Sequence, residues 1–276
     1  MSQTPTPVQI TADGLIVLRT DAMMMKAVGA EDPFAPWFVT DEGRRMAMLA
    51  AASDSVFAVF NLARYRWFSE RLENAAAHYS QAIVLGAGYD TRPLWMEAFK
   101  AGTCRVFLVD MPTTIAARQS ILQAHGISLP DWVVPVPCDL DTDDLGQLLS
   151  NAGFQSAQPT FVMAEGLFYY LRSETLLKLL SPSGLGLASG SAIYFDLWND
   201  ERVDRLNEQV FERRGIRIFK TFPFSQENEA LTATLVGLGY EDIKITSLDS
   251  VARAYWPPSY HWANGEGWAL IEMRVK

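Results

Sequence analysis

The sequence predicts an α/β fold built around one mostly parallel β-sheet. From Gln81 onward, short runs rich in β-branched residues alternate with helical stretches, a pattern typical of parallel strands joined by right-handed helical crossovers. The chain has 276 residues, of which 49% are hydrophobic, and this length suits one elaborated domain better than two. We therefore expect one sheet, with additional helices at its ends.

Seven segments have the composition of β-strands. In chain order they are QAIVL, RVFLV, WVVPVP, PTFVMA, SAIYFDLW, YEDIKITSL and WALIEMRVK. The first five are separated by helical stretches long enough for βαβ crossovers, whereas the last two read as a closing pair. The sequence therefore predicts a seven-stranded sheet that is mostly parallel and ends in an antiparallel hairpin.

Helical patterns join and flank these strands. The expected helices cover residues 91–100, 113–125, 141–152, 173–180, 200–214 and 226–238. Residues 15–78 carry apolar side chains at helical spacing, which predicts a helical cap over residues 1–78 and a core over residues 79–276 within one structural domain. The charged segment 198–224 is interpreted as a helical lid inserted in that core.

Composition narrows the class of ligand. A net charge of −9 argues against binding a nucleic-acid backbone, because such binding depends on clustered Lys and Arg. Cys104 and Cys138 are the only cysteines and form no C-x-x-C pair, so we expect no metal site, no disulfide and a reduced, cytoplasmic setting. No apolar run reaches membrane length. We expect a soluble protein with a small-molecule partner, and its oligomeric state is left open.

A glycine-rich turn follows the first strand. Gly86 and Gly88 in GAGYDTR would let backbone N–H groups approach a cofactor closely. Asp110 ends the next strand, where Rossmann-like sites place a carboxylate that accepts hydrogen bonds from ribose hydroxyls. The alternative for Asp110 is an N-cap of the following helix. Thr91 stands where a dinucleotide fingerprint has its third glycine, which favours a nucleoside cofactor without pyrophosphate.

The exits of the third and fourth strands add three more candidates. Asp139 and Leu140 follow the third strand and could hold an adenine, with acidic helix capping as the alternative. Glu165 follows the fourth strand, at the topological centre of the predicted site. Its alternative role is that of a solvated loop acid.

Six motifs occur in order between Asp21 and Leu171: DAMMMKAVGAEDPF, LARYRWF, VLGAGYDTR, VFLVDMP, PCDL and MAEGLFYYL. Together they resemble the leucine carboxyl methyltransferase family, which includes protein C-terminal methyltransferases, a tRNA-modifying branch and bacterial polyketide carboxyl methyltransferases. The resemblance implies a Rossmann-like class I methyltransferase fold with S-adenosylmethionine as cofactor and S-adenosylhomocysteine as product.

The resemblance also implies individual roles in cofactor binding. Lys26 and Arg64 would reach the cofactor's carboxylate, with Arg66 as the rival of Arg64 and with a solvated helix position as the alternative for Lys26. The other implied contacts are Gly86 and Gly88 with the methionine portion, Asp110 with the ribose, Asp139 and Leu140 with the adenine, and Glu165 with the amino group.

The acceptor is expected to be the carboxylate of a small molecule such as a polyketide or aromatic acid. A carboxylate is already ionised near neutral pH and needs no general base. A phenol or alcohol would need one, and His261 is the candidate. Substrate-binding candidates are Tyr169, Arg202, Tyr255, Tyr260 and Trp262, although the C-terminal aromatic residues could instead pack the last hairpin. The same sheet would also suit a methyltransferase of protein C-termini, a non-catalytic cofactor-binding protein or an NAD-dependent oxidoreductase.

Overall fold

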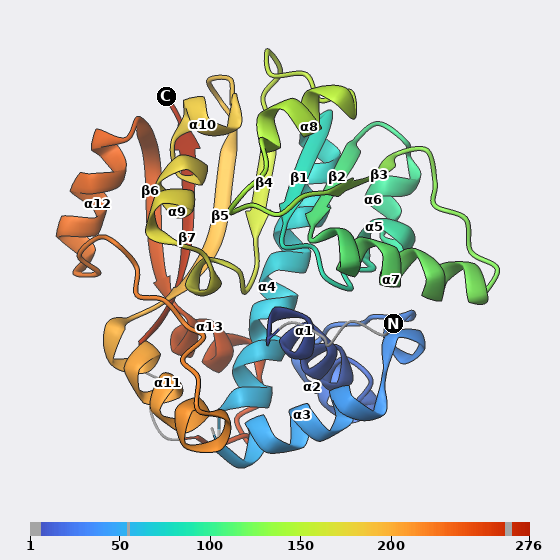
Figure 1. Ribbon diagram of the computed structural model, residues 1–276, viewed down its shortest axis with the longest axis vertical. Helices are drawn as coiled ribbons and strands as arrows, with labels where there is room; N and C mark the ends of the chain where they lie inside the picture. The colour runs from blue at the N-terminus through green and yellow to red at the C-terminus, as the bar shows by residue number, and fades with distance from the viewer. Residues whose placement is uncertain (1–6, 54–55, 263–266) are drawn as a thin grey trace.

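A computed structural model describes residues 7–53, 56–262 and 267–276. One twisted sheet runs through the molecule with helices on both of its faces, and the N-terminal helices gather at one end of the strands (Figure 1). The strands are β1 (Gln81–Leu85), β2 (Arg105–Asp110), β3 (Val133–Pro137), β4 (Phe161–Ala164), β5 (Ala192–Trp198), β6 (Tyr240–Ser247) and β7 (Trp268–Val275).

The strand order is β3-β2-β1-β4-β5-β7-β6. Strands β1 to β5 pair in parallel, and β7 runs antiparallel to both β5 and β6. This confirms the predicted seven-stranded sheet with an antiparallel final pair. The chain adds β2 and β3 on one side of β1 and then returns to place β4 on its other side. This reversal is a topological switch point, where open α/β sheets bind ligands at the carboxyl ends of their strands.

The helices that precede β1 are α1 (Pro7–Leu18), α2 (Ala22–Val28), the 3₁₀ helix η1 (Ala35–Phe38), α3 (Asp41–Ser53) and α4 (Phe57–His78). Those between β1 and β5 are α5 (Arg92–Trp95), α6 (Glu97–Lys100), α7 (Pro112–Ala124), α8 (Leu145–Asn151), the 3₁₀ helix η2 (Phe168–Tyr170), α9 (Ser173–Leu179) and α10 (Pro182–Leu185). The remaining ones are α11 (Asp200–Arg214), α12 (Asn228–Gly237) and α13 (Leu248–Tyr255).

Two apolar layers hold the sheet between these helices. Successive side chains of a strand point to opposite faces, so Val84 packs with α4, α6 and α13, whereas Leu85 packs with α8, α9 and α12. Every residue of β1 is buried, as expected for a central parallel strand covered on both faces. None of the helices within the described residues is long and apolar enough to cross a membrane.

The segment predicted as a helical cap divides into two parts. Helix α4 belongs to the core, because its buried residues Phe60, Trp67 and Phe68 share one apolar cluster with the sheet. Helices α1 to α3 lie beyond the end of the strands (Figure 1). The boundary at residue 78 therefore falls between two elements of the same core, and the division into cap and core stays a prediction.

Two crossover helices differ from the expected ranges. The stretch 91–100 is broken at Met96, which adopts an extended conformation with φ −63° and ψ 131° between α5 and α6. The helix expected from residue 141 begins only at Leu145, because the Asp144 side chain caps it by accepting a hydrogen bond from Gln147 N. Hydrogen bonding by short polar side chains thus decided this boundary.

The segment predicted as a lid is anchored to the strand exits. The Asn207 side chain on α11 accepts hydrogen bonds from Ile218 N and Phe219 N, at 3.1 and 2.9 Å, and donates one to Phe219 O. Lys220 N donates to Tyr169 O at 2.7 Å. These bonds hold the loop after α11 beside the exit of β4, and its opening as a lid stays a prediction.

Candidate cofactor and active site

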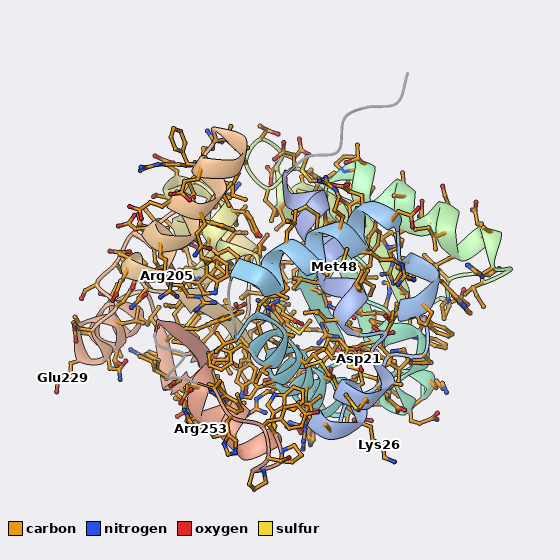
Figure 2. All side chains as sticks on the ribbon, turned by 90° about the horizontal axis from the view of Figure 1, so that it is seen from below. Asp21, Lys26, Met48, Arg205, Glu229 and Arg253 are labelled. Carbon is orange, nitrogen blue, oxygen red and sulfur yellow. The ribbon has the colours of Figure 1, made fainter. Side chains whose placement is uncertain are left out.

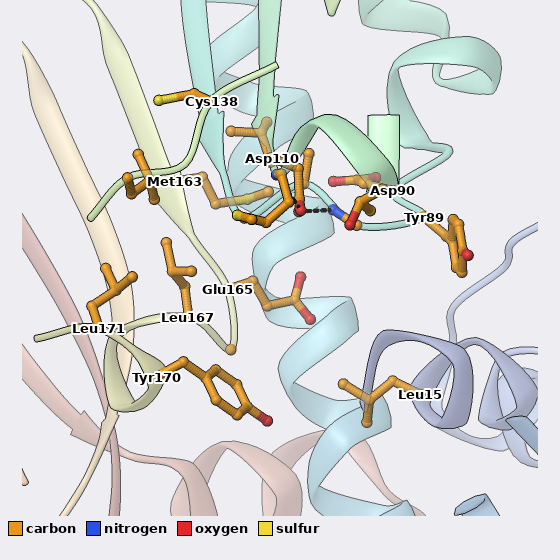
Figure 3. A pocket seen from close by; sticks show the side chains of 18 of the residues that line it. Leu15, Tyr89, Asp90, Asp110, Cys138, Met163, Glu165, Leu167, Tyr170 and Leu171 are labelled. Atoms are coloured by element: carbon orange, nitrogen blue, oxygen red, sulfur yellow. Dashed lines mark hydrogen bonds between the residues drawn. The ribbon is translucent and has the colours of Figure 1, made fainter. Parts of the chain in front are cut away.

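The carboxyl ends of β1, β2, β3 and β4 open into one cavity of about 200 Å³. Figure 3 shows Asp110 and Cys138 on one side of it, Met163, Leu167 and Leu171 on another, and Leu15 of α1 opposite Glu165. Parallel register brings these exits together, because Leu85 at the end of β1 pairs with both Val109 and Ala164. The cavity therefore lies at the topological switch point between β1 and β4.

At the glycine turn, Gly86 and Gly88 line this cavity with backbone atoms. Gly86 and Gly88 have φ values of +64° and +48°, a region that L-residues with side chains rarely adopt. A Cβ atom at Gly86 would lie 2.8 Å from Leu167 Cδ1. Glycine at residue 86 is therefore required both by the turn and by the close approach of the loop after β4.

Asp110 ties the exit of β2 to this turn. Its Oδ2 accepts a hydrogen bond from Gly88 N and its Oδ1 accepts one from Met111 N, each at 2.7 Å. The N-cap residue of α7 is Met111, so Asp110 is a strand-end carboxylate and not the helix cap considered as its alternative. Burial raises the pKa of Asp110 above its ordinary value, although both backbone N–H groups oppose that shift.

This raised pKa predicts an acid limb in cofactor binding. A carboxylate that accepts from ribose hydroxyls loses that capacity when protonated, so affinity should fall as pH drops through the Asp110 pKa. The affinity should begin to decline at a pH above the ordinary aspartate pKa of about 3.9. Below the raised pKa of Asp110, the decline should approach tenfold per pH unit. Calorimetric titration of S-adenosylhomocysteine from pH 8 down to the pH at which the protein begins to unfold measures this. Affinity that stays constant over the whole range would contradict it.

Glu165 joins a buried network of charges at the exit of β4. Its Oε2 lies 2.8 Å from Arg92 Nη2 and its Oε1 lies 3.3 Å from Arg64 Nε. The Glu165 side chain is only 8% exposed, which rules out the solvated loop acid. Burial opposes its ionisation, but the attraction of Arg92 and Arg64 outweighs burial and lowers the pKa of Glu165. Glu165 is therefore an anion at neutral pH.

Arg64, rather than its rival Arg66, lines the cavity. From α4 it reaches Asp196 Oδ2 at 3.1 Å and the Tyr169 hydroxyl at 3.0 Å. Arg66, on the same helix, instead donates to Val28 O and to Glu70 Oε1. The choice of Arg64 from the sequence agrees with this geometry.

Asp139 and Leu140 also line the cavity, as predicted. Asp139 Oδ1 accepts a hydrogen bond from Asp141 N at 3.0 Å, which shapes the loop after β3. Since Asp144 caps α8, Asp139 is not the helix cap that was its alternative. Its side chain is half-buried at the rim of the site.

Lys26 does not reach the cavity. It lies on the exposed side of α2 and points away from the protein (Figure 2), and it is absent from the described cavity lining. The basic residue that does line the cavity from this part of the chain is Arg19, in the turn after α1. The assignment of Lys26 is therefore replaced by the exposed helix position considered as its alternative.

The C-terminal aromatic residues pack against helices and not around the cavity. Tyr255 donates to Glu70 on α4, the Tyr260 ring packs at a tilt against Trp256 with ring centroids 4.6 Å apart, and Trp262 donates to Asp249. His261 is exposed and lies outside the described cavity lining. This arrangement agrees with the alternative in which these residues only pack the end of the chain.

The two remaining substrate-binding candidates are buried next to the site. The Tyr169 ring stacks on Trp198 with centroids 3.7 Å apart and planes 7° apart, and Arg202 lies over the Trp268 ring at 4.8 Å. Neither contributes to the described lining, where Tyr170 stands instead. The sequence-based prediction named Tyr169, whereas its neighbour Tyr170 in the same 3₁₀ turn lines the cavity.

Three charged residues of the buried network around Glu165 were not predicted from the sequence. Arg92 contacts Asp90 through two hydrogen bonds, Nε to Oδ1 at 2.9 Å and Nη2 to Oδ2 at 2.7 Å, and all three groups, Asp90, Arg92 and Asp196, are buried. The missed signal for Asp196 is a lone acid inside the apolar strand SAIYFDLW. Buried charges are rarely left unpaired, so that acid pointed to a cationic partner.

The sheet order and the cavity define an α/β protein with a ligand-sized cavity at its switch point. The family model of leucine carboxyl methyltransferase matches residues 17–183. The chain belongs to this family of S-adenosylmethionine-dependent methyltransferases, which confirms the predicted family and cofactor.

Two curated relatives agree with this assignment. A protein of Mycolicibacterium smegmatis is 33% identical over 70% of this chain and 64% of its own length, and one of Rhodococcus jostii is 30% identical over 91% and 88%. Both are named as candidate S-adenosyl-L-methionine-dependent methyltransferases. The chain thus spans slightly less than two thirds of the first of these relatives.

Two crystal structures share the fold at low sequence identity. A candidate methyltransferase of Thermobifida fusca superposes with a TM-score of 0.60 at 16% identity, over 100% of both chains. A DUF574 family protein of Streptomyces avermitilis gives a TM-score of 0.62 at 16% identity, over 97% of this chain and 100% of its own.

Proposed function

We propose that this protein transfers a methyl group from S-adenosylmethionine to the carboxylate of a small molecule, such as a polyketide or aromatic acid. The observation that carries the proposal is the lack, among the described cavity residues, of a base suited to a phenol or alcohol. No histidine occurs in that lining. Burial raises the pKa of the Cys138 thiol to about 11, so this group stays protonated near neutral pH.

Two central carboxylates of the cavity already have other partners. Glu165 is held as an anion between Arg92 and Arg64, and Asp110 holds the glycine turn through two backbone N–H groups. An acceptor that arrives already ionised needs neither of them as a base. Its oxygen lone pair would form the bond to the methyl carbon, while the carbon–sulfur bond breaks and its electrons stay on sulfur. No proton is transferred in that step.

The residues present fit the cofactor. Gly86 and Gly88 line the cavity with backbone that the methionine portion could approach, and the Asp110 carboxylate stands at the strand end where a ribose is recognised. Asp139 and Leu140 line the cavity and would contact the adenine, and the anionic Glu165 would attract the ammonium group. When bound, S-adenosylmethionine supplies an electrophilic methyl group. The chain's own part is to align the acceptor with that group and to exclude water.

Methyl transfer from radiolabelled S-adenosylmethionine tests the proposal with three acceptor sets: aromatic and polyketide-like acids, phenols, and peptides with free C-termini. We expect labelled product from the acids alone, with the label released as methanol by mild alkali. Its rate should not change with pH above about 6, because carboxyl groups titrate near pH 4. Phenol methylation that rises at alkaline pH, or turnover of peptides only, would overturn the proposal.

A further inference from the structure

Arg19 is the cation of the described cavity lining with the fewest carboxylate contacts, since it has one such partner whereas Arg64 and Arg92 have two each. Its side chain is 13% exposed, and its Nη1 is buried without a hydrogen-bond partner. The nearest acid, Asp32, lies 3.6 Å away through its Oδ2, beyond hydrogen-bond distance. The other oxygen of Asp32 already accepts from Ala35 N and from the Thr91 hydroxyl.

The neighbouring arginines differ in this respect. Arg64 contacts Glu165, Asp196 and the Tyr169 hydroxyl, and Arg92 contacts both Asp90 and Glu165. Their charges are compensated inside the protein. Arg19 is also held in place, because its guanidinium lies over the Tyr65 ring at 4.3 Å, so it presents a fixed, partly unused donor set.

Arg19 and Glu165 face the same space. Both line the main cavity, and both also line a small adjoining hollow together with Arg64 and Asn61. Attraction by Arg19 contributes to the lowered pKa of Glu165. A ligand group that carries an ammonium next to a carboxylate matches this arrangement, in which the Glu165 carboxylate and the Arg19 guanidinium line the same space.

We infer that Arg19 binds the α-carboxylate of the cofactor's methionine portion, in place of Lys26. This inference rests on the proposed cofactor placement, in which the α-amino group faces Glu165. Guanidinium groups bind carboxylates through charge-assisted hydrogen bonds. Lys26 lies on an exposed helix side outside the lining, whereas Arg19 is already inside it.

The test compares one ligand that carries the amino-acid end with one that lacks it. S-adenosylhomocysteine carries the α-amino and α-carboxylate groups, whereas 5′-methylthioadenosine keeps the adenosine and the sulfur but lacks both. Calorimetry should show that Arg19→Met weakens S-adenosylhomocysteine by about 10- to 100-fold, the range for a lost charge-assisted contact. Binding of 5′-methylthioadenosine should be unchanged. Arg19→Lys should retain part of the affinity, and Lys26→Met should alter neither ligand.

Each contrary outcome overturns a separate statement. Equal weakening of both ligands by Arg19→Met would show a structural role, and unchanged S-adenosylhomocysteine binding with a higher acceptor KM would assign Arg19 to the acceptor. Selective weakening by Lys26→Met would restore Lys26. In all of these cases the wild type binds both ligands. A wild type that binds neither would refute the proposed cofactor site itself.

Discussion

Replacing Arg92 by methionine is expected to lower the free energy of unfolding by about 3–5 kcal/mol, the usual range when one partner of a buried ion pair is removed. The Arg92 side chain is 2% exposed and contacts Asp90 and Glu165, each through Nη2. Its removal leaves two buried carboxylates without their main partner. Chemical denaturation followed by tryptophan fluorescence measures the change.

The matched control is Arg45→Met. Arg45 is exposed and pairs with Glu42 one helical turn away, and exposed pairs of this kind contribute little to stability, so its unfolding midpoint should not move. Arg92→Lys keeps the charge but loses the two-pronged contact with Asp90, and should fall between the two. An Arg92→Met midpoint equal to that of Arg45→Met would refute the account.

The same variant should also change the pH dependence of stability. The attraction of Arg92 lowers the folded-state pKa of both Asp90 and Glu165 despite their burial. A lowered pKa contributes stability above the unfolded-state values, near 4, that is lost as pH falls through the folded-state pKa. In Arg92→Met this main attraction is lost, so burial raises the folded-state pKa of both carboxylates relative to wild type. The difference between wild type and Arg92→Met should therefore be largest near neutral pH and shrink as pH falls from the variant's folded-state pKa values towards those of the wild type.

Much of the fold and half of the site follow from local sequence features. The strands were predictable because apolar, β-branched runs alternate with crossover helices, and the antiparallel pairing of the last two runs was predicted too. These two strands do not form the predicted hairpin, because helix α13 lies between them and had no expected counterpart. Asp110, Asp139 and Glu165 were predictable as neighbours because each follows the carboxyl end of a parallel strand. In such cases topology alone brings residues together.

The remaining site residues depend on packing that local sequence does not determine. Arg19 and Lys26 are both basic and seven residues apart, and which of them faces the cavity depends on how α1 and α2 lie over the strand ends. The C-terminal aromatic residues have the composition of a pocket wall, but their contacts with α4 place them in a packing role. A pocket wall and a packing cluster have the same composition, so only tertiary contacts distinguish these two roles.

Asp110→Asn is expected to weaken S-adenosylhomocysteine binding by about 100-fold or more, because the neutral side chain loses charge-assisted bonds to the ribose. The amide also has only one acceptor oxygen for the two donors, Gly88 N and Met111 N, that the carboxylate now satisfies. Unlike Arg19→Met, this change should weaken 5′-methylthioadenosine equally, since both ligands carry the ribose. Calorimetry with the two ligands measures both effects.

Asp144→Asn is the matched control, since Asp144 is an exposed N-cap of α8 and asparagine caps helices equally well. Ligand affinity and unfolding midpoint should both stay at wild-type values in that variant. Because burial already disfavours the charged form of Asp110, its neutral replacement should cost less stability than Arg92→Met, and the loss should appear in binding. Unchanged affinity in Asp110→Asn would show that the ribose binds elsewhere. The assignments of the methionine end and the adenine end of the cavity would then also be refuted.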